Sequence, residues 1–402
     1  MTNDKKVFIL GIIVFIFVFS LRGQNLNNVG ISLTGGYGWV APINDFVRGI
    51  NPDNEKIKSM TNFSLRLTKQ VDGSEYWHYL YNGFYYGAGL FHGQFNYSKH
   101  LGNPFAVYGL IGFNFLNTKV FSLKSELALG VSGIWQTYSD NYRYNVAVSS
   151  PVETYIHADL EGYFSINQHW QVNLGASFIH FSNGNLRQPN KGINILTPAL
   201  GVTYIPQQIV HINRKLLENN PRDTKEMFKP HWQSQYNIYF AQKGMYVFYE
   251  KPDNSGAMQE DTARGVYPIV GLQARCLRKF AINHALGLGF DLTYNESIGK
   301  NEETYYYPNN YKDNISKSQH LTFSTFLSYE YNIHRLSFML EPGIYIYRYK
   351  DSYLPQVFER INIRYQFNYG IFAQLGIRAY DFRKADYLEF GLGYRFKHKN
   401  SL

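Results

Sequence analysis

Several features on which soluble enzymes rely are scarce in this sequence. Cysteine occurs once among the 402 residues, at Cys276, which excludes an intramolecular disulfide framework. The twelve histidines are scattered and show no zinc-site spacing, so we expect neither a metal nor another cofactor. After the first 20 residues no apolar run is long enough to span a bilayer as a helix. The rest of the chain therefore crosses a membrane as strands or not at all.

The first 24 residues have the composition of a secretory signal peptide. Lys5 and Lys6 precede an apolar run from Val7 to Phe19, which is followed by small and polar residues. A basic start, a short apolar core and a polar end are typical of an export signal. A transmembrane anchor, the alternative, needs about 18 or more apolar residues. We therefore predict that residues 1–24 are a signal peptide.

Aromatic residues are abundant, with 35 Tyr and 30 Phe, and the apolar residues alternate with polar or small ones. Such alternation places one kind of side chain on each face of a strand. It is clear in the segments Phe121 to Trp135, Ala158 to Ile166, Leu336 to Ile346 and Leu388 to Phe396. Strands of soluble sandwiches are usually about five or six residues long, whereas these have about ten or more, as transmembrane strands do. With the signal, this predicts an all-β fold, an antiparallel transmembrane barrel in the bacterial outer membrane.

The alternating segments form two groups. About eight lie between Val29 and Tyr204, and about six to eight lie between Tyr236 and Phe396. The stretch between the groups is polar and breaks the pattern. We therefore divide the exported chain into a barrel half (residues 25–206), a polar linker (207–231) and additional transmembrane strands (232–402).

Two arrangements of these strands are open. The last strand ends on the aromatic Phe396, as last strands of bacterial barrels do, and such barrels close by pairing the last strand with the first. This favours one enlarged barrel of about 14–16 strands. The long linker favours the alternative, an eight-stranded barrel followed by a second β domain, because periplasmic connections are usually short.

One short stretch carries chemistry. The strand from Trp170 to Phe178 alternates, and its period of two places His180 and Ser182 on the apolar, lipid-facing stripe. A histidine and a serine two residues apart on one face can act as general base and nucleophile. Polar groups facing lipid are costly without a function, although the headgroup level tolerates both residues. No GxSxG hydrolase motif occurs elsewhere in the chain.

The residues around this pair resemble a known family. The letters HFSN at residues 180–183 are followed by Pro189, Asn190 and Gly192 before the next strand. This arrangement resembles the signature of the PagL-type lipid A 3-O-deacylases, grouped with acyloxyacyl hydrolases, over about residues 25–206. These are eight-stranded outer-membrane barrels that remove an ester-linked acyl chain from lipid A. The resemblance therefore implies a carboxylic ester hydrolase whose partner is lipid A, or lipopolysaccharide.

The resemblance also implies roles for individual residues. His180 would be the general base and Ser182 the nucleophile, while Asn183 and Asn190 would form the oxyanion site or orient the catalytic groups. The family's third catalytic residue, a glutamate fourteen residues after the histidine, is replaced here by Asn194. An amide still holds the tautomer of an imidazole, but it stabilises the imidazolium less well.

The direction of the chain predicts where this pair lies. If the mature amino terminus is periplasmic, the strand ending at His180 is the seventh and ascends to the leaflet that contains lipopolysaccharide. Arg187 and Lys191, in the following loop, are then placed to meet lipid A phosphates. The formal net charge of +9 fits an anionic partner. The lack of a basic nucleic-acid motif argues against nucleic acid.

Two classes of function remain open. The first is an outer-membrane lipid hydrolase that uses Ser182 and His180. The second is a non-catalytic barrel, either a porin or an envelope-interaction protein that keeps the shape of the motif. Charged residues on the predicted inner stripe, among them Lys124, Glu126 and Asp159, fit a porin lumen. They also fit a sealed barrel with internal ion pairs.

Overall fold

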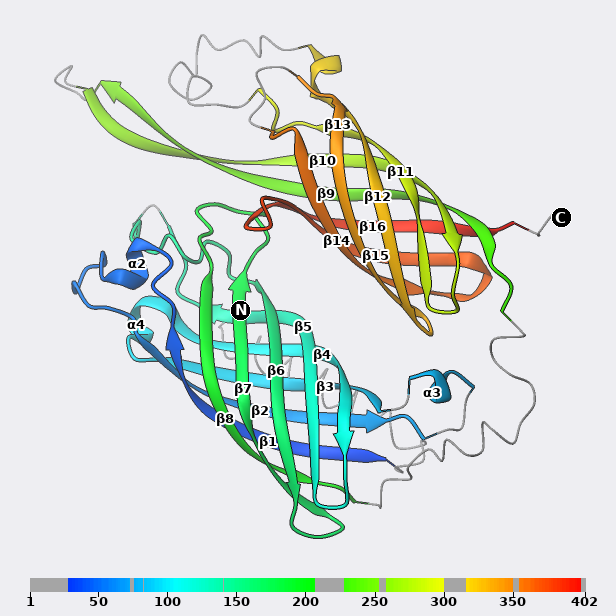
Figure 1. Cartoon of the computed structure of the whole chain (residues 1–402). Helices are drawn as coiled ribbons and strands as arrows, with labels where there is room; N and C mark the ends of the chain where they lie inside the picture. The colour runs from blue at the N-terminus through cyan, green and yellow to red at the C-terminus, as the bar shows by residue number, and fades with distance from the viewer. Residues whose placement is uncertain are drawn as a thin grey trace. The chain divides into compact units, whose positions relative to one another are not determined.

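The computed structural model describes most of the exported chain. The predicted signal peptide, residues 1–24, lies outside the described residues, as do residues 207–227 of the predicted linker. Among the described residues, no helix is long and apolar enough to cross a bilayer. They fall into two compact units, each containing a closed eight-stranded antiparallel barrel (Figure 1). The described ranges are 28–72, 76–81, 83–139, 141–206, 228–252, 258–299, 316–349 and 354–398.

In the first barrel every strand pairs with its neighbours in sequence. β1 also pairs with β8, from Ile31 opposite Tyr204 to Val40 opposite Ile195, which closes the barrel. Three short helices lie in the connections: α2 (Asp45–Arg48), α3 (Tyr76–Leu80) and α4 (Ser98–Leu101). The strands are β1 (Val29–Val40), β2 (Ser59–Gln70), β3 (Phe84–Phe95), β4 (Gly102–Asn117), β5 (Phe121–Trp135), β6 (Glu153–Ser165), β7 (Trp170–Ser182) and β8 (Ile193–Tyr204).

The second barrel repeats this pattern with strands of its own. β16 pairs with β9, with Tyr394 opposite Tyr236, and this pairing closes the barrel. Two 3-10 turns, η2 (Lys317–His320) and η3 (Asn368–Gly370), lie in its connections. The strands are β9 (His231–Pro252), β10 (Met258–Lys279), β11 (His284–Asn295), β12 (Leu321–Ile333), β13 (Leu336–Tyr347), β14 (Val357–Gln366), β15 (Ile371–Tyr380) and β16 (Lys384–Lys397).

The predicted antiparallel barrel fold is confirmed, but in its alternative form. The strands do not make one enlarged barrel of about 14–16 strands. They make an eight-stranded barrel followed by a second β domain, which is itself a barrel. Phe396 does lie in a closing strand, yet the partner of that strand is β9 and not β1. Alternation specifies which face of a strand meets lipid and not which strand it pairs with, so the pattern could not decide between the two forms.

Each barrel presents apolar side chains outward and polar side chains inward. In β7, Leu174 and Phe178 are exposed, whereas Asn173 and Ser177 are buried. In β13, Leu340 is exposed and Glu341 is buried. This distribution is the reverse of that in a soluble protein and is the one expected of a wall surrounded by lipid.

Ion pairs fill the interior of the first barrel. The guanidinium of Arg66 lies 3.1 Å from Asp159, 3.0 Å from Glu161 and 3.5 Å from Glu126, and all four residues are buried. Buried charges of this kind persist when they are paired and hydrogen-bonded. The guanidinium of Arg66 therefore neutralises part of the charge of three carboxylates.

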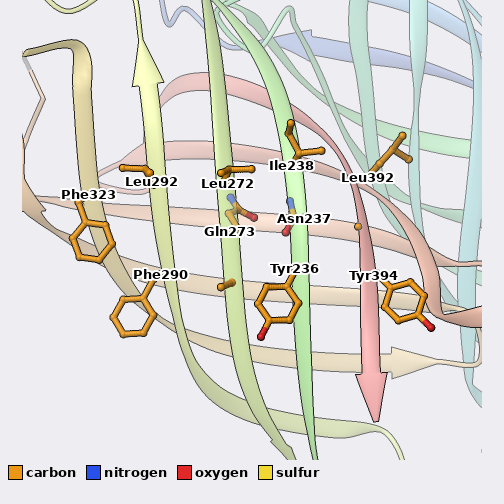
Figure 2. Close-up of a pocket in the computed structure, with 12 residues that line it drawn as sticks. Tyr236, Asn237, Ile238, Leu272, Gln273, Phe290, Leu292, Phe323, Leu392 and Tyr394 are labelled. Atoms are coloured by element: carbon orange, nitrogen blue, oxygen red, sulfur yellow. The ribbon is translucent and has the colours of Figure 1, made fainter. Parts of the chain in front are cut away.

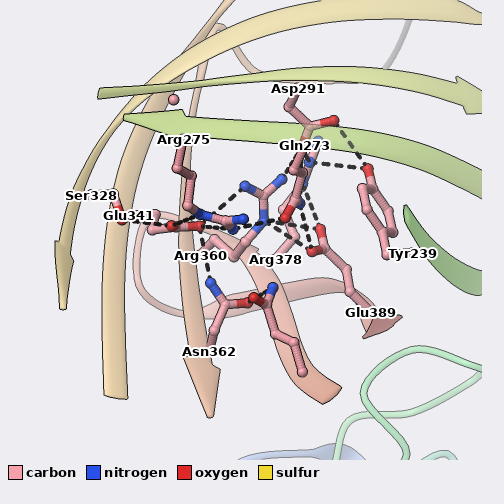
Figure 3. A network of polar contacts seen from close by, with 12 residues as sticks. Tyr239, Gln273, Arg275, Asp291, Ser328, Glu341, Arg360, Asn362, Arg378 and Glu389 are labelled. Atoms are coloured by element: carbon pink, nitrogen blue, oxygen red, sulfur yellow. Dashed lines mark hydrogen bonds and ion pairs between the residues drawn. The ribbon is translucent and has the colours of Figure 1, made fainter. Parts of the chain in front are cut away.

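A larger network fills the interior of the second barrel (Figure 3). Arg275 donates through Nε to Glu341 at 2.6 Å, and Arg360 and Arg378 both bind Asp291. These side chains are fully or almost fully buried. The interior of an eight-stranded barrel is just wide enough for side chains. The network therefore occupies the lumen.

The two ends of the first barrel differ in the length of their connections. Outer-membrane barrels have short periplasmic turns and longer extracellular loops. The end at which β7 finishes and β8 begins has the long connections, so it is the extracellular end. The connections there are 41–58, 96–101, 136–152 and 183–192, against 71–83, which contains α3, and the short turns 118–120 and 166–169 at the other end.

Candidate active site

Three polar side chains meet at the extracellular end of β7 and β8. His180 and Asn194 are directly opposite each other on the two strands. Nδ1 of His180 lies 2.5 Å from Oδ1 of Asn194, and Nε2 lies 2.9 Å from Oγ of Ser182. Hydroxyl, imidazole and amide thus form one hydrogen-bonded chain, in the order of nucleophile, base and orienting group.

The amide oxygen decides which imidazole nitrogen is free to act as a base. An amide oxygen only accepts hydrogen bonds, so the contact with Asn194 Oδ1 requires a neutral His180 to carry its proton on Nδ1. Nε2 then has a free lone pair and faces the hydroxyl of Ser182. This is the tautomer required for Nε2 to accept the hydroxyl proton during a nucleophilic attack.

The pair lies on the outer wall of the barrel, on the stripe that the alternation predicted. His180 and Ser182 are half-buried. Their cross-strand neighbours in β6 are Ile156, opposite His180, and Thr154, opposite Ser182. Ile156 is exposed on the same wall. The hydroxyl is therefore approached from the lipid side, next to an apolar surface.

Gly192 packs against the imidazole. Its φ is +69°, in the left-handed region that favours glycine, and a Cβ there would lie 3.2 Å from Cε1 of His180. The carbonyl of Gly192 accepts a hydrogen bond from Asn44 Nδ2 at 3.0 Å. Asn44 also caps α2, since its Oδ1 accepts from the N–H of Val47. Glycine therefore allows the chain to pass close to the imidazole, and Asn44 ties the β1–β2 loop to that point.

Asn183 and Asn190 are bonded to each other in the loop that follows Ser182. The backbone N–H of Asn183 donates to Oδ1 of Asn190 at 3.3 Å. Oδ1 of Asn183 accepts from the backbone N–H of Arg187 at 3.4 Å. Both amide side chains thus shape the loop that begins directly after the serine hydroxyl.

Arg187 and Lys191 are exposed in this loop. Neither forms an ion pair with another residue in the described part of the chain. The backbone of Lys191 is fixed, because its N–H donates to the carbonyl of Val146 at 3.0 Å. Both cations are therefore open to an anionic ligand from outside the protein.

Sequence reasoning missed three neighbours of the His180 and Ser182 site. Thr154 and Ile156 could have been found, because the short turn at 166–169 fixes the register of β6 against β7. Asn44 could not, because it contacts Gly192 across 148 residues of chain through two loops. The alternation in the strands does not predict contacts between loops.

One set of groups inside the first barrel has the chemistry of metal ligands. Glu126, His157 and Asp159 each offer a ligand atom, and these atoms lie within 4.8 Å of one another. Arg66 already binds both carboxylates. Ion pairing thus accounts for the two carboxylates, whereas Nδ1 of His157 has no hydrogen-bond partner among the described residues. All three groups lie in the barrel interior rather than beside Ser182 on the outer wall.

Comparisons with known proteins match both barrels. Residues 56–203 match the family described as lipid A 3-O-deacylase (PagL), and residues 234–399 match the family described as acyloxyacyl hydrolase, C-terminal domain. The first match contains His180, Ser182 and Asn194. The resemblance noted from the sequence motif is thus confirmed, and it extends to the second barrel.

Comparison with solved structures gave matches of low identity. The outer membrane enzyme PagL is 16% identical, with 42% of this chain and 97% of that chain covered and a TM-score of 0.28. The ferric enterobactin receptor PfeA is 10% identical, with 88% and 53% covered and a TM-score of 0.24. A mutant of the Rh. blastica porin is 11% identical, with 92% and 99% covered and a TM-score of 0.17. Comparison with curated proteins gave no match.

Proposed function

Because the chain belongs to the PagL-type family of outer-membrane lipid A deacylases and acyloxyacyl hydrolases, we propose that it removes an ester-linked acyl chain from lipid A by a Ser/His mechanism. The observation that carries the proposal is the hydrogen-bonded chain from Ser182 through His180 to Asn194. Its position supports the same substrate, because the extracellular end of an outer-membrane barrel meets the leaflet that contains lipopolysaccharide.

In the proposed reaction, Oγ of Ser182 attacks the carbonyl carbon of the ester while Nε2 of His180 accepts the hydroxyl proton. The tetrahedral intermediate then expels the sugar alkoxide, which takes that proton from His180, and the acyl group stays on Ser182. Water attacks this acyl-enzyme with Nε2 as the base and releases a fatty acid. One ester and one water thus give one alcohol and one carboxylic acid.

In this mechanism Asn194 is a positioning residue. Its oxygen keeps the proton of neutral His180 on Nδ1, which leaves Nε2 available to Ser182. It places no negative charge beside the imidazolium that forms during the attack. We therefore expect turnover that is slower than with a carboxylate at the same position.

The loop after Ser182 supplies the remaining roles. The contact between Asn183 and Asn190 supports an orienting role for both, and their amide N–H groups are also candidate donors to the oxyanion. Arg187 and Lys191 are exposed and suit the lipid A phosphates, with the planar fork of arginine the better match to two phosphate oxygens.

Release of fatty acid from lipid A by the purified protein in detergent micelles tests the proposal. Ser182→Ala should abolish release, since loss of a triad member costs about 10⁴-fold or more in serine hydrolases. Thr154→Ala is the matched control, because it removes the hydroxyl directly opposite Ser182 on the same wall. Equal release by wild type and Ser182→Ala would exclude the serine mechanism. No release by either would favour the non-catalytic barrel.

A further inference from the structure

The outer wall of the second barrel contains an apolar groove with a volume of about 530 Å³ (Figure 2). Two cross-strand rows of outward-facing residues form it, and they run over β16, β9, β10 and β11. Figure 2 shows the two rows side by side. One row is Tyr394, Tyr236, Ala274 and Phe290, and the other is Leu392, Ile238, Leu272 and Leu292, with Phe323 of β12 next to Leu292.

Small side chains on β10 and β9 make the wall hollow. Ala274 lies between Tyr236 and Phe290, so a methyl group separates two aromatic rings. In the next row towards the end of β10, Cys276 lies opposite Ser234. A trough of small residues therefore leads along the wall into the groove.

Nitrogen donors lie at the open end of this trough. Arg278 follows Cys276 on the same face, and its guanidinium carbon lies 5.6 Å from the centroid of the Trp232 ring. Arg278 forms no ion pair within the described ranges. His398 is held nearby, because its backbone N–H donates to the Trp232 carbonyl at 3.1 Å and the Nε2 of its imidazole lies 2.7 Å from Oγ of Ser234. An exposed arginine and a fixed imidazole thus mark the level of the lipid headgroups.

This end of the second barrel faces the periplasm. Short turns mark the periplasmic side of an outer-membrane barrel, and aromatic residues mark the interface. The trough therefore opens at the inner leaflet. The turns at the Arg278 end are 280–283, 334–335 and 367–370. The other end has the connections 253–257 and 381–383 and, in addition, the two long connections 296–320 and 348–356.

The dimensions of the trough fit a diacyl lipid. A strand rises about 3.3–3.4 Å per residue, so Ala274 lies roughly 13 Å and Leu272 roughly 20 Å from Arg278 along β10. In a lipid whose phosphate is bound at Arg278, an acyl chain can thus extend over Cys276 and Ala274 to the groove. Arginine binds phosphate oxygens with its planar fork, and the groove takes up hydrocarbon.

We propose that the outer wall of the second barrel binds one glycerophospholipid of the inner leaflet. Its phosphate lies at Arg278 and His398, and one acyl chain lies in the groove over Ala274. The site does not depend on the proposed hydrolysis, because none of its residues belongs to the catalytic group.

Native mass spectrometry of the full chain, with phosphatidylglycerol added to the detergent micelles, tests this site. The wild type should retain phosphatidylglycerol, and Arg278→Ala should weaken its apparent affinity by about tenfold, since it removes charged hydrogen bonds. Ala274→Phe should weaken binding without changing any charge, because it fills the hollow between Tyr236 and Phe290. Heat-modifiable migration in electrophoresis shows that each variant is folded.

Arg335→Ala is the matched control, since Arg335 is exposed in a short turn at the same end and lies outside the groove. It should leave the affinity unchanged. Equal losses with Arg278→Ala and Arg335→Ala would overturn the proposal, because general attraction to the cationic end would then explain binding. Full affinity in Ala274→Phe would overturn the acyl position. Equal occupancy by lipid A in a parallel experiment would overturn the assignment to a glycerophospholipid.

Discussion

Asn194 is the residue at which this chain departs from a complete Ser/His/acid triad. Its oxygen lies 2.5 Å from Nδ1 of His180 and holds the tautomer that serves Ser182. Its amide is neutral, so the imidazolium formed in the proposed reaction has no opposite charge beside it. Asn194 can therefore orient the imidazole as a carboxylate would, but it cannot stabilise the imidazolium with a negative charge.

Asn194→Glu should consequently accelerate the release of fatty acid from lipid A. Loss of the acid in a serine protease costs about 10⁴-fold in kcat, so even partial restoration is measurable as a higher turnover number. The gain must vanish in the double variant with Ser182→Ala. If Asn194→Glu leaves the rate unchanged or abolishes it while Ser182→Ala inactivates the wild type, the amide has a specific role of its own.

Gly192→Ala should slow the same reaction by about 10–100-fold, because displacement of a catalytic group by a fraction of an ångström is costly. The added Cβ would lie 3.0 Å from the carbonyl oxygen of Phe181 and 3.2 Å from Cε1 of His180, and φ at this position is +69°. The expected loss is in kcat more than in KM. Gly109→Ala is the control, since its Cβ would meet no heavy atom closer than 4.0 Å. Equal kinetics of the two variants would show that Gly192 does not position the imidazole.

At the scale of elements, hydrogen bonds and ion pairs link three extracellular connections, β1–β2, β3–β4 and β5–β6. Asp53 in the β1–β2 loop accepts from Lys99 of α4 at 2.6 Å and contacts Nε2 of His100 at 2.8 Å. Nδ1 of His100 lies 2.6 Å from the hydroxyl of Tyr142 in the β5–β6 loop. One histidine thus bridges a carboxylate and a phenol from two other connections.

Acid should weaken the contacts of Asp53 with Lys99 and His100. The hydrogen bonds from Lys99, and then from His100, hold the pKa of Asp53 below its ordinary value of 3.8. A depressed pKa means that the ionised carboxylate stabilises the folded loops above that ordinary value, and that the stabilisation is lost as the pH falls through the depressed pKa. Hydrogen exchange of residues 41–58 and 96–101, corrected for the intrinsic effect of pH, should therefore rise in strong acid.

Asp53→Asn should raise the exchange of the same loops already at neutral pH, because it removes the charge that Lys99 contacts. Asp45→Asn is the matched control, since in the described part of the chain Asp45 forms an ion pair only with the exposed Arg48 of its own helix. Equal protection of the loops in wild type and Asp53→Asn would contradict the role of this carboxylate.

The strands were predictable because their alternation is a local property. β5 has the predicted bounds, Phe121 to Trp135, and His180 and Ser182 share the predicted outer stripe. The contact of Asn194 with His180 also follows from neighbouring strands, since it needs only the register of one hairpin. The contact between Asn44 and Gly192 depends on how two loops pack, and no pattern in the sequence records that.

At the scale of the whole molecule, the closure of the barrels was the part that the sequence could not decide. Pairing of β1 with β8 joins residues about 170 positions apart, and pairing of β9 with β16 joins residues about 150 apart. Both the two-barrel and the enlarged-barrel forms satisfy the same alternation in every strand. In the sequence, only the long polar linker between Tyr204 and His231 indicated that the strands form two barrels, each closed by its own strands.

Reconstituted protein should form no large, stable channel in planar bilayers. The lumen of the first barrel holds Arg66 with its carboxylates, and that of the second holds the network around Arg360. Both sets of side chains are buried within walls of only eight strands. Conductance typical of porins would contradict sealed lumens and would favour the non-catalytic porin.

The most direct test of the central claim is mass spectrometry of lipid A from cells that produce the wild type or Ser182→Ala at equal levels in the outer membrane. If Ser182 and His180 form the proposed catalytic pair, lipid A from wild-type cells should lose the mass of one ester-linked acyl chain, and lipid A from Ser182→Ala cells should remain intact. Lipid A that is intact in both strains, or shortened equally in both, would contradict the account.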